Sequence, residues 1–475
     1  MSSLTSALTT ARSGLDATQV WSEVTSNNIA NTNTQGYVRK EVNFSTTSVG
    51  QGGAVQVTDV QRDVNTSLDQ MYWSASSQVA TQQAIYEGVQ AYTSVLGQPS
   101  DQMSPVTKLT NLQTAFDTLA NSPDSAGAQQ GALDAAKAMA TSLNTTSGTL
   151  NEVKGEVTTE IKYNVTDVNQ ALYKIAALNK QVAASPSGSV LLANLQDQLG
   201  TLVQTVAQQM NVQVSTDSTG QLSLYTAGGT TLVQGQQVND LRYDSPSGKL
   251  YAGSQEITPG TTGVRGFTDG SLAGLFQLQN TILPTFQRQL DNLAANLIQG
   301  FQAQDASLAP GQAGLFTDAG AAYNAANIDG LAGRIAINAA VDPAQGGTLS
   351  RIRDGIGAAT PGPTGDSTQV NAFLNVFTQA TTNAPGTNLP NGMTMADYTS
   401  NMVSYQQVAG TNAQKSFNDL QTSAQTINAS RQSVEGVNLD NELQNLIVIQ
   451  HNYAANAKVM GTISTMMDAL IQAVQ

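Results

Sequence analysis

The chain has no cysteine and only one histidine among its 475 residues. Without cysteine it cannot form disulfide bonds, thiolate metal sites or a cysteine nucleophile. The single histidine, His451, would have to serve any serine–histidine–aspartate triad, because histidine is the usual general base near neutral pH. We therefore expect no enzyme activity and no cofactor.

Charge is also scarce. Charged residues make up 11% of the chain, against about 25% in ordinary soluble proteins, and the net charge is −14. An acidic chain without a basic run is not expected to bind nucleic acid or an anionic membrane surface. No run of 18 apolar residues is present, so the sequence predicts no transmembrane helix. The first twenty residues lack the basic and apolar regions of a secretory signal peptide, and we expect no cleaved signal.

Two catalytic interpretations have weak support. Gly365-Asp366-Ser367 is similar to the nucleophile block of GDS-type esterases, but those enzymes need an aspartate three residues before the histidine, where this chain has Val448. No calcium-binding D-x-D-x-D-G loop is present and no carboxylate pair stands out. A secreted helical effector or hydrolase is kept only as the alternative from a different functional class.

Apolar residues at helical spacing lie at both ends of the chain. Leu4, Leu8, Ala11 and Leu15 predict an amphipathic helix that is too weakly apolar to be stable alone. Near the other end, steps of four and three residues give a seam in which nine of eleven positions are apolar. The seam is Leu439, Leu443, Leu446, Gln450, Tyr453, Ala457, Met460, Ser464, Met467, Ile471 and Val474. A core helix would show the same stripe, but an amphipathic helix at each end favours a paired terminal coiled coil.

The middle of the chain shows the same helical spacing over four segments, 157–182, 191–210, a segment from Pro284 to Phe301, and 398–427. Between 211 and 268 the period changes to two, with turn residues between the apolar pairs, which predicts a small antiparallel β unit. A shorter hairpin is expected from Tyr37 to Val60, and residues 305–360 show no clear period. We predict a mainly α protein, an elongated helical bundle with a terminal coiled coil and a small antiparallel β subdomain.

The run from Asn27 to Gly36 is rich in asparagine and threonine, which form local side-chain-to-backbone hydrogen bonds, so we expect a structured turn. Gly36 is expected to adopt positive φ, and Asn27, Asn28 and Asn31 to satisfy backbone groups where the N-terminal helix ends. This helix, the Asn-rich turn and the G-Y-x-R entry into a strand resemble the N-terminal signature of the bacterial flagellar rod, hook and hook-associated proteins.

The C-terminal stretch is similar to the matching signature of the same family, through N-L-D-x-E-L at 438–443 and Y-x-A-N-A-K-V at 453–459. The helical middle and the segment Gly270 to Leu275 resemble the hook-associated branch, which joins hook to filament. The resemblance implies three domains: residues 1–45 with 432–475 as a terminal coiled-coil axial core, 46–210 with 269–431 as a helical rod, and 211–268 as an outer β domain. A hook, rod or flagellin-like axial protein is the nearest alternative.

The resemblance also implies an extracellular location at the hook–filament junction, after export without signal cleavage. Its expected partners are hook protein, a filament-side hook-associated junction protein, further copies of itself, and an export chaperone that holds the C-terminal helix. Assembly residues are expected at both ends of the chain. They are Asn27, Asn28, Ile29, Asn31, Gly36, Tyr37, Leu439, Leu443, Leu446, Tyr453, Asn456, Met460 and Met467.

Overall fold

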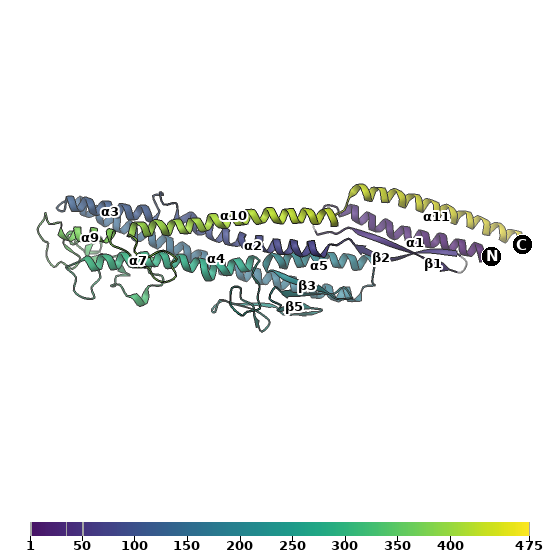
Figure 1. Ribbon diagram of the computed structural model, residues 1–475, viewed down its shortest axis with the longest axis horizontal. Coiled ribbons are helices and arrows are strands. Elements are labelled where there is room, and N and C mark those ends of the chain that lie inside the picture. The colour runs from purple at the N-terminus through teal and green to yellow at the C-terminus, as the bar shows by residue number, and fades with distance from the viewer. Residues whose placement is uncertain (1, 35, 50–51, 475) are drawn as a thin grey trace. The chain divides into compact units, whose positions relative to one another are not determined.

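The computed structural model describes residues 2–34, 36–49 and 52–474 (Figure 1). They fall into two compact units. Unit 1 comprises Met1–Ala80, Tyr163–Ala273 and Asp419–Gln475, and unit 2 comprises Thr81–Lys162 and Gly274–Asn418. Three long helices, α2 (Thr66–Leu96), α4 (Ala126–Ala184) and α10 (Met395–Glu435), contribute residues to both units. The prediction of a mainly α chain with small antiparallel sheets is confirmed.

Unit 1 begins with α1 (Ser2–Ala30) and ends with α11 (Leu439–Val474). A hairpin follows α1 and packs against it, formed by β1 (Lys40–Val49) and β2 (Gly52–Arg62). The predicted hairpin is therefore present, although its strand pairing starts at Lys40 and not at Tyr37. Gly50 and Gln51, in its expected loop, lie outside the described residues. Helix α5 (Val190–Gln209) begins at the N-cap Ser189, whose hydroxyl accepts from the Leu192 amide.

The predicted β unit is also present in unit 1. One sheet has the order β3-β4-β5-β6 and a second has the order β7-β8-β9, all antiparallel. The strands are β3 (Val212–Thr216), β4 (Leu222–Thr226), β5 (Thr231–Gln234), β6 (Gln237–Val238), β7 (Leu241–Asp244), β8 (Lys249–Ala252) and β9 (Gln255–Glu256).

Two asparagines of α4 fix these sheets in the same way. Asn179 bonds both backbone groups of Leu222 at 2.7 and 2.8 Å, and Asn169 does the same to Leu241. The Asn169 amide therefore pairs with the edge strand β7, and the Asn179 amide, which also donates to the Gly235 carbonyl, bridges β4 and the residue after β5.

Unit 2 has an aromatic core between α3 (Pro105–Asn121), α7 (Leu283–Gln304) and α9 (Thr368–Thr378). The ring of Phe301 lies 5.5 Å from that of Phe116 and 5.3 Å from that of Phe373, and all three side chains are fully buried. Helices at 66–96, 105–121 and 368–378 are not among those predicted from the sequence, and α4 begins some thirty residues before the predicted start at 157. Helix α7 is preceded by α6 (Ser271–Gln277) and one π-helical turn, Leu278–Ile282, so the helical path begins well before Pro284.

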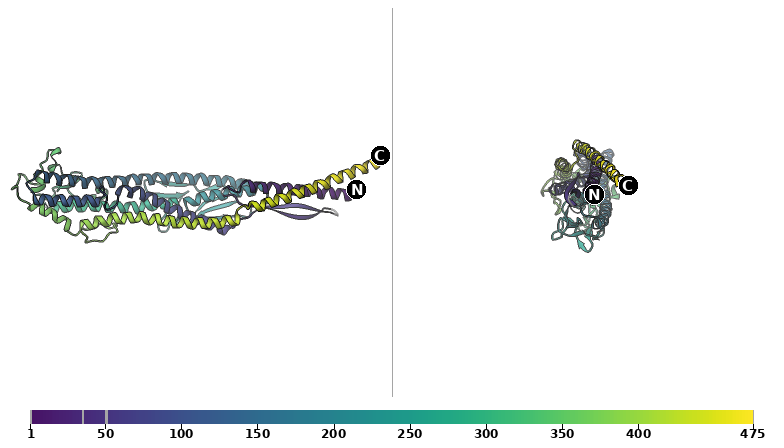
Figure 2. Two further views of the ribbon diagram at one scale, coloured as in Figure 1. Left: turned by 90° about the horizontal axis from the view of Figure 1, so that it is seen from above. Right: turned by 90° about the vertical axis from the view of Figure 1, so that its right-hand side faces the viewer.

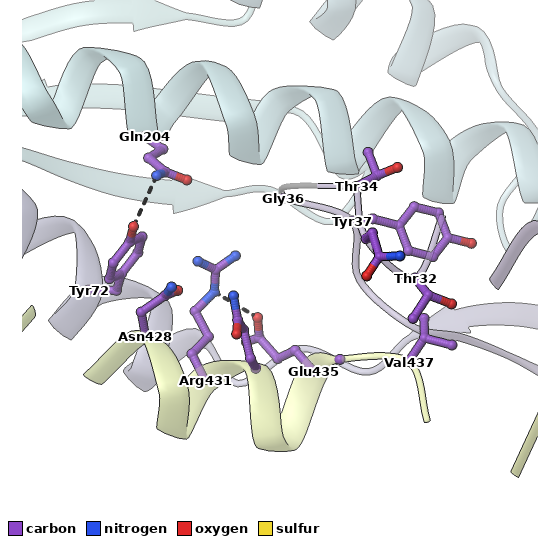
Figure 3. Close-up of a pocket in the computed structure, with 13 residues that line it drawn as sticks. Thr32, Thr34, Gly36, Tyr37, Tyr72, Gln204, Asn428, Arg431, Glu435 and Val437 are labelled. Carbon is purple, nitrogen blue, oxygen red and sulfur yellow. Dashed lines mark hydrogen bonds and ion pairs between the residues drawn. The ribbon is translucent and has the colours of Figure 1, made fainter. Parts of the chain in front are cut away.

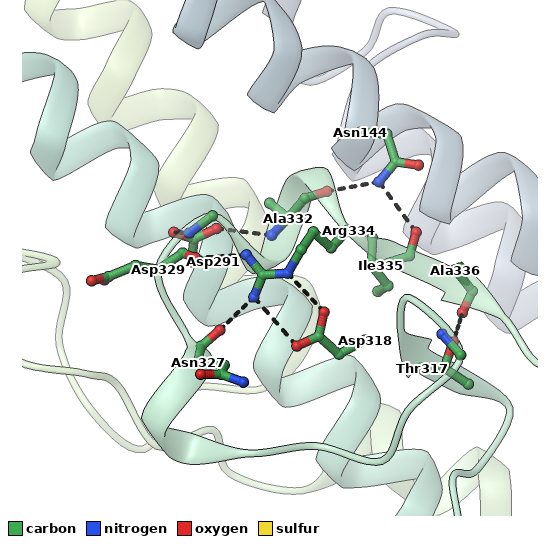
Figure 4. A network of polar contacts seen from close by, with 12 residues as sticks. Asn144, Asp291, Thr317, Asp318, Asn327, Asp329, Ala332, Arg334, Ile335 and Ala336 are labelled. Atoms are coloured by element: carbon green, nitrogen blue, oxygen red, sulfur yellow. Dashed lines mark hydrogen bonds and ion pairs between the residues drawn. The ribbon is translucent and has the colours of Figure 1, made fainter.

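Residues 305–360, which have no periodic pattern, are held by polar contacts (Figure 4). They contain β10 (Phe316–Asp318), β11 (Ile335–Ile337), several 3-10 turns and the short helix α8 (Ser350–Asp354). The buried carboxylate of Asp291 accepts hydrogen bonds from the amides of Gly330 and Ala332, both at 2.8 Å. Arg334 pairs with Asp318 at 2.8 Å. Side-chain contacts of this kind leave no periodic signal in the sequence, so the structure of this segment is not predictable from its pattern.

Candidate assembly site

The turn between α1 and β1 is shorter than predicted. Helix α1 continues to Ala30, so Asn27, Asn28 and Ile29 belong to its last turn and not to the loop. The side-chain amide of Asn31 donates to the Asn27 carbonyl at 2.9 Å. This bond satisfies one of the carbonyls left open at the helix end, as predicted. Thr32 does the same for the carbonyls of Asn28 and Ile29.

Asn28 has a different role from the predicted one. Its side chain is fully buried, and it bonds both backbone groups of Lys40, donating at 2.9 Å and accepting at 3.1 Å. The same Asn28 oxygen accepts from the Tyr37 hydroxyl at 2.9 Å. Asn28 therefore closes the turn by joining the end of α1 to the start of β1. Burial, followed by the charges of Asp197 and Glu442, raises the pKa of Tyr37, so the hydroxyl stays protonated.

Gly36 has φ +80°, as the sequence predicted. A Cβ at this position would lie 2.8 Å from the Thr201 hydroxyl oxygen on α5, so the turn also approaches a neighbouring helix closely. Gln35 lies outside the described residues. Glycine is required here for two separate reasons, the backbone conformation and the narrow space.

A buried ion-pair cluster fixes the base of the hairpin to α5. Lys40 and Arg62 are paired directly across the two strands, and both contact the Asp197 carboxylate, at 2.5 and 2.7 Å. The Lys40 ammonium also lies 3.9 Å from the centre of the Tyr37 ring. Burial lowers the pKa of Lys40, although Asp197 opposes this. Asp197 is not predictable from the sequence, because a single acidic residue in an amphipathic helix carries no distinguishing pattern.

The two terminal signatures meet in space. Arg39, of the G-Y-x-R motif, places its Nε 2.9 Å from a carboxylate oxygen of Glu442, of the N-L-D-x-E-L motif. The Arg39 amide also donates to the Glu435 carbonyl at the end of α10. The Glu442 side chain is only 2% exposed, so the structure joins residues 403 positions apart through a buried ion pair.

Helices α1 and α11 lie side by side and run in opposite directions (Figure 2). Asn456 faces Gly14 closely enough that a Cβ on Gly14 would lie 2.7 Å from its amide nitrogen. Ile449 and Ile463 are buried, and Leu446, Asn456 and Met460 are half-buried. The other expected residues of α11 are exposed: Leu439, Leu443, Tyr453 and Met467. Ile449 and Ile463, which are buried, lie outside the predicted seam.

A polar cavity of about 590 Å³ lies beside the turn (Figure 3). Its walls come from residues 32–37 without Gln35, from Tyr72 and Gln204, and from the end of α10 with Gly436 and Val437. The Arg431 guanidinium lies over the Tyr72 ring at 5.1 Å and pairs with Asp69 and Glu435. Among the described residues no cluster of histidine, cysteine, aspartate or glutamate could hold a metal ion. No helix among them is long and apolar enough to cross a membrane.

Comparisons with known families agree with this arrangement. Residues 89–314 match the family described as Flagellar hook-associated protein FlgK helical domain. Residues 8–37 match Flagella basal body rod protein, and residues 428–473 match Flagellar basal body rod FlgEFG protein C-terminal. The C-terminal match includes Glu442, and the N-terminal match ends at Tyr37, two residues before Arg39.

Relatives extend over nearly the whole chain. Flagellar hook-associated protein 1 of Bacillus subtilis is 24% identical over 99% of this chain and 98% of its own length. The protein of the same name from Escherichia coli is 26% identical over 98% of this chain and all of its own length. A solved structure, the flagellar hook junction protein FlgK from Burkholderia pseudomallei, covers 52% of this chain and 46% of that one at 26% identity, with a TM-score of 0.44. The chain is thus similar over nearly its full length to flagellar hook-associated protein 1 of two bacteria, and its helical middle matches the FlgK helical-domain family.

Proposed function

We propose that this protein is a structural subunit that joins the hook of the bacterial flagellum to its filament. The observation that supports this most directly is the contact between the two terminal signatures, which holds α11 beside α1 while leaving much of α11 uncovered. A helix with exposed Leu443, Tyr453 and Met467 is incomplete as a monomer and is completed by neighbouring subunits. The relatives are flagellar structural proteins, which supports a structural role in place of catalysis.

The partners follow from this role. The subunit contacts hook protein on one side, a filament-side hook-associated junction protein on the other, and copies of itself within the junction. Before export, which leaves its N-terminus uncleaved, an export chaperone covers the apolar residues of α11. Amphipathic helices commonly bind such partners through apolar anchors at this spacing. The assembly residues that we assign are the turn residues around Asn28 and Gly36 and the exposed residues of α11.

The esterase alternative finds no support at its own residues. The Asp366 carboxylate accepts hydrogen bonds from the amide and hydroxyl of Thr368, and the Ser367 hydroxyl accepts from Asn371. Both residues thus stabilise the start of α9. His451 is exposed on α11.

Labelled protein on cells tests the proposal. A chain carrying an epitope tag in the β unit, at the exposed turn near Gly248, is expressed in cells that lack their own copy. We expect electron microscopy to find the label at hook tips, with filaments attached beyond it. Label that is confined to the cell interior, or distributed along filaments, contradicts a junction subunit.

A further inference from the structure

Helices α10 and α11 are separated by only three residues, Gly436 to Asn438. The Gly436 amide donates to the Gln432 carbonyl and ends α10. The Asn438 side chain accepts from the amide of Asp440 at 3.0 Å and begins α11. We refer to residues 435–442 as the elbow. A connection this short allows many directions for α11, so the contacts around it must select one.

Glu435 makes three of these contacts. One carboxylate oxygen accepts from the Asn65 amide at 2.8 Å, just before α2, and the other accepts from Arg431 at 2.9 Å. Its carbonyl accepts from the Arg39 amide at 2.9 Å. A carboxylate is unfavourable at the end of its own helix, where the dipole is negative, but favourable at the N-terminus of another. The geometry at Glu435 therefore stabilises the junction between α10 and α2 at the expense of α10 alone.

Arg39 also holds the far side of the elbow, where α11 begins. Arg39 contacts Glu435 through its backbone and Glu442 through its side chain. Glu435 is 3% exposed and Glu442 is 1% exposed, so neither can exchange its partner for water without moving the chain. Breaking a buried pair by removing one partner leaves an uncompensated charge, which is strongly unfavourable.

We propose that Glu435 is the positioning residue of the elbow and that, together with Arg39, it sets the direction in which α11 leaves α10. The ion pairs on the two sides of the elbow, Arg431 with Glu435 and Arg39 with Glu442, add little net stability but select one geometry among several. Fixing this direction also fixes which face α11 presents to neighbouring subunits, a consequence that rests on the proposed function. The direction itself is a property of the isolated chain.

The absence of native cysteine makes a direct test possible. Spin labels on Gln208→Cys in α5 and Lys458→Cys in α11, both at exposed positions, report the direction of α11 as a distribution of distances. We expect a narrow distribution in the parent chain and a distribution at least twice as broad with Glu435→Ala. Glu435→Gln retains an acceptor for the Asn65 amide and should give an intermediate width. A control pair at Gln208→Cys and Ser430→Cys should stay narrow in all three chains.

A matched variant separates this role from general loss of charge. Glu41 is a second partner of Arg39 but its side chain is 52% exposed, so Glu41→Ala should leave the distribution narrow. An unchanged distribution in folded Glu435→Ala would overturn the proposal. If that variant does not fold, Glu442→Ala tests the other side of the elbow and should broaden the same distance. If Glu435→Ala broadens the distribution but the parent chain itself never reaches hook tips, the proposed function is refuted and the elbow proposal stands.

Discussion

Helices α7 and α11 both carry apolar residues at helical spacing but differ in how many of them are buried. In α7, of unit 2, 13 of 22 residues are buried, including Phe286, Leu290 and Phe301. In α11, of unit 1, the only described side chains that are fully buried are those of Glu442, Ile449 and Ile463, while ten large apolar residues are exposed. The first helix completes its packing within the chain, and the second does not. An apolar stripe therefore identifies a surface that will be covered but not which molecule covers it.

One polar network from each unit can also be compared. In unit 2, the buried Gln406 side chain accepts from the Tyr92 hydroxyl at 2.8 Å and donates to Gln289 at 2.7 Å. Every partner in that chain of hydrogen bonds is neutral. In unit 1, the contacts around the turn and the elbow use charged pairs, Lys40 with Asp197 and Arg39 with Glu442. Neutral networks are typical of a fixed core, whereas charged pairs at a junction select an orientation.

The largest expected effect on stability is in the core of unit 2. Phe301→Ala removes a fully buried ring that contacts Phe116, Phe316, Phe373 and Phe377. We expect a loss of about 3–5 kcal/mol in the free energy of unfolding, measured by chemical denaturation. Leu470→Ala, on exposed α11, should change it by less than about 0.5 kcal/mol. Equal losses in the two variants would mean that the two helices do not differ as described.

The next largest effect on stability is expected at Asp69, a buried carboxylate of unit 1. Burial, followed by the charge of Glu435, raises the pKa of Asp69 to about 6. The folded state therefore binds this proton more tightly than the unfolded state, and the contribution of Asp69 to stability falls as the pH rises from about 4 to 6. Asp69→Asn should raise the free energy of unfolding above pH 6 by up to about 3 kcal/mol, and its advantage should vanish near pH 4.

Asp291 is the matched carboxylate in unit 2. Burial raises its pKa as well, but it accepts from two amides and from Gln287. Asp291→Asn removes acceptors that these donors need and should cost about 1–3 kcal/mol. Denaturation of both variants across pH 4–8 checks the contrast. A loss of stability in Asp69→Asn at pH 7.5 would show that its pairing with Arg431 outweighs its desolvation.

A smaller effect is expected at the turn. Gly36→Val forces a β-branched residue to φ +80° and against Thr201, at a cost of about 1–2 kcal/mol for the conformation alone. We expect faster hydrogen exchange in β1 of unit 1, no change in unit 2, and failure of filament growth on existing hooks. Gly461→Ala is the control, because it lies in α11 with open space around it and should be neutral or stabilising. Normal swimming of Gly36→Val cells would remove the turn from the assembly site.

These particular residues show what the sequence could and could not supply. The positive φ of Gly36 and the β unit at 211–268 followed from local chemistry, because turn residues and period-two spacing act within a few positions. The roles of Asp197 and Glu435 did not, because each depends on partners between 135 and 396 positions away. The exposed face of α11 was unpredictable for a related reason. A heptad pattern contains the apolar residues of every contact the helix can make, whereas among the described residues α11 packs mainly against α1.

Replacing exposed apolar residues of α11 should have the smallest effect on the stability of the monomer and the largest effect on assembly. Leu443 is 48% exposed and Tyr453 is 54% exposed, so replacing both by serine should change the free energy of unfolding by less than about 0.5 kcal/mol. If neighbouring subunits bury these side chains, each replacement removes about 1.5–3 kcal/mol of apolar burial per contact, repeated at every subunit of the junction. The double variant should therefore be folded and exported but missing from hook tips by immunoelectron microscopy. Gln444→Ser with Asn452→Ser, at exposed polar positions of the same helix, is the matched control and should assemble normally. Failure of export in the double variant would assign the exposed face of α11 to the chaperone. Normal assembly would show that neighbouring subunits do not need Leu443 and Tyr453.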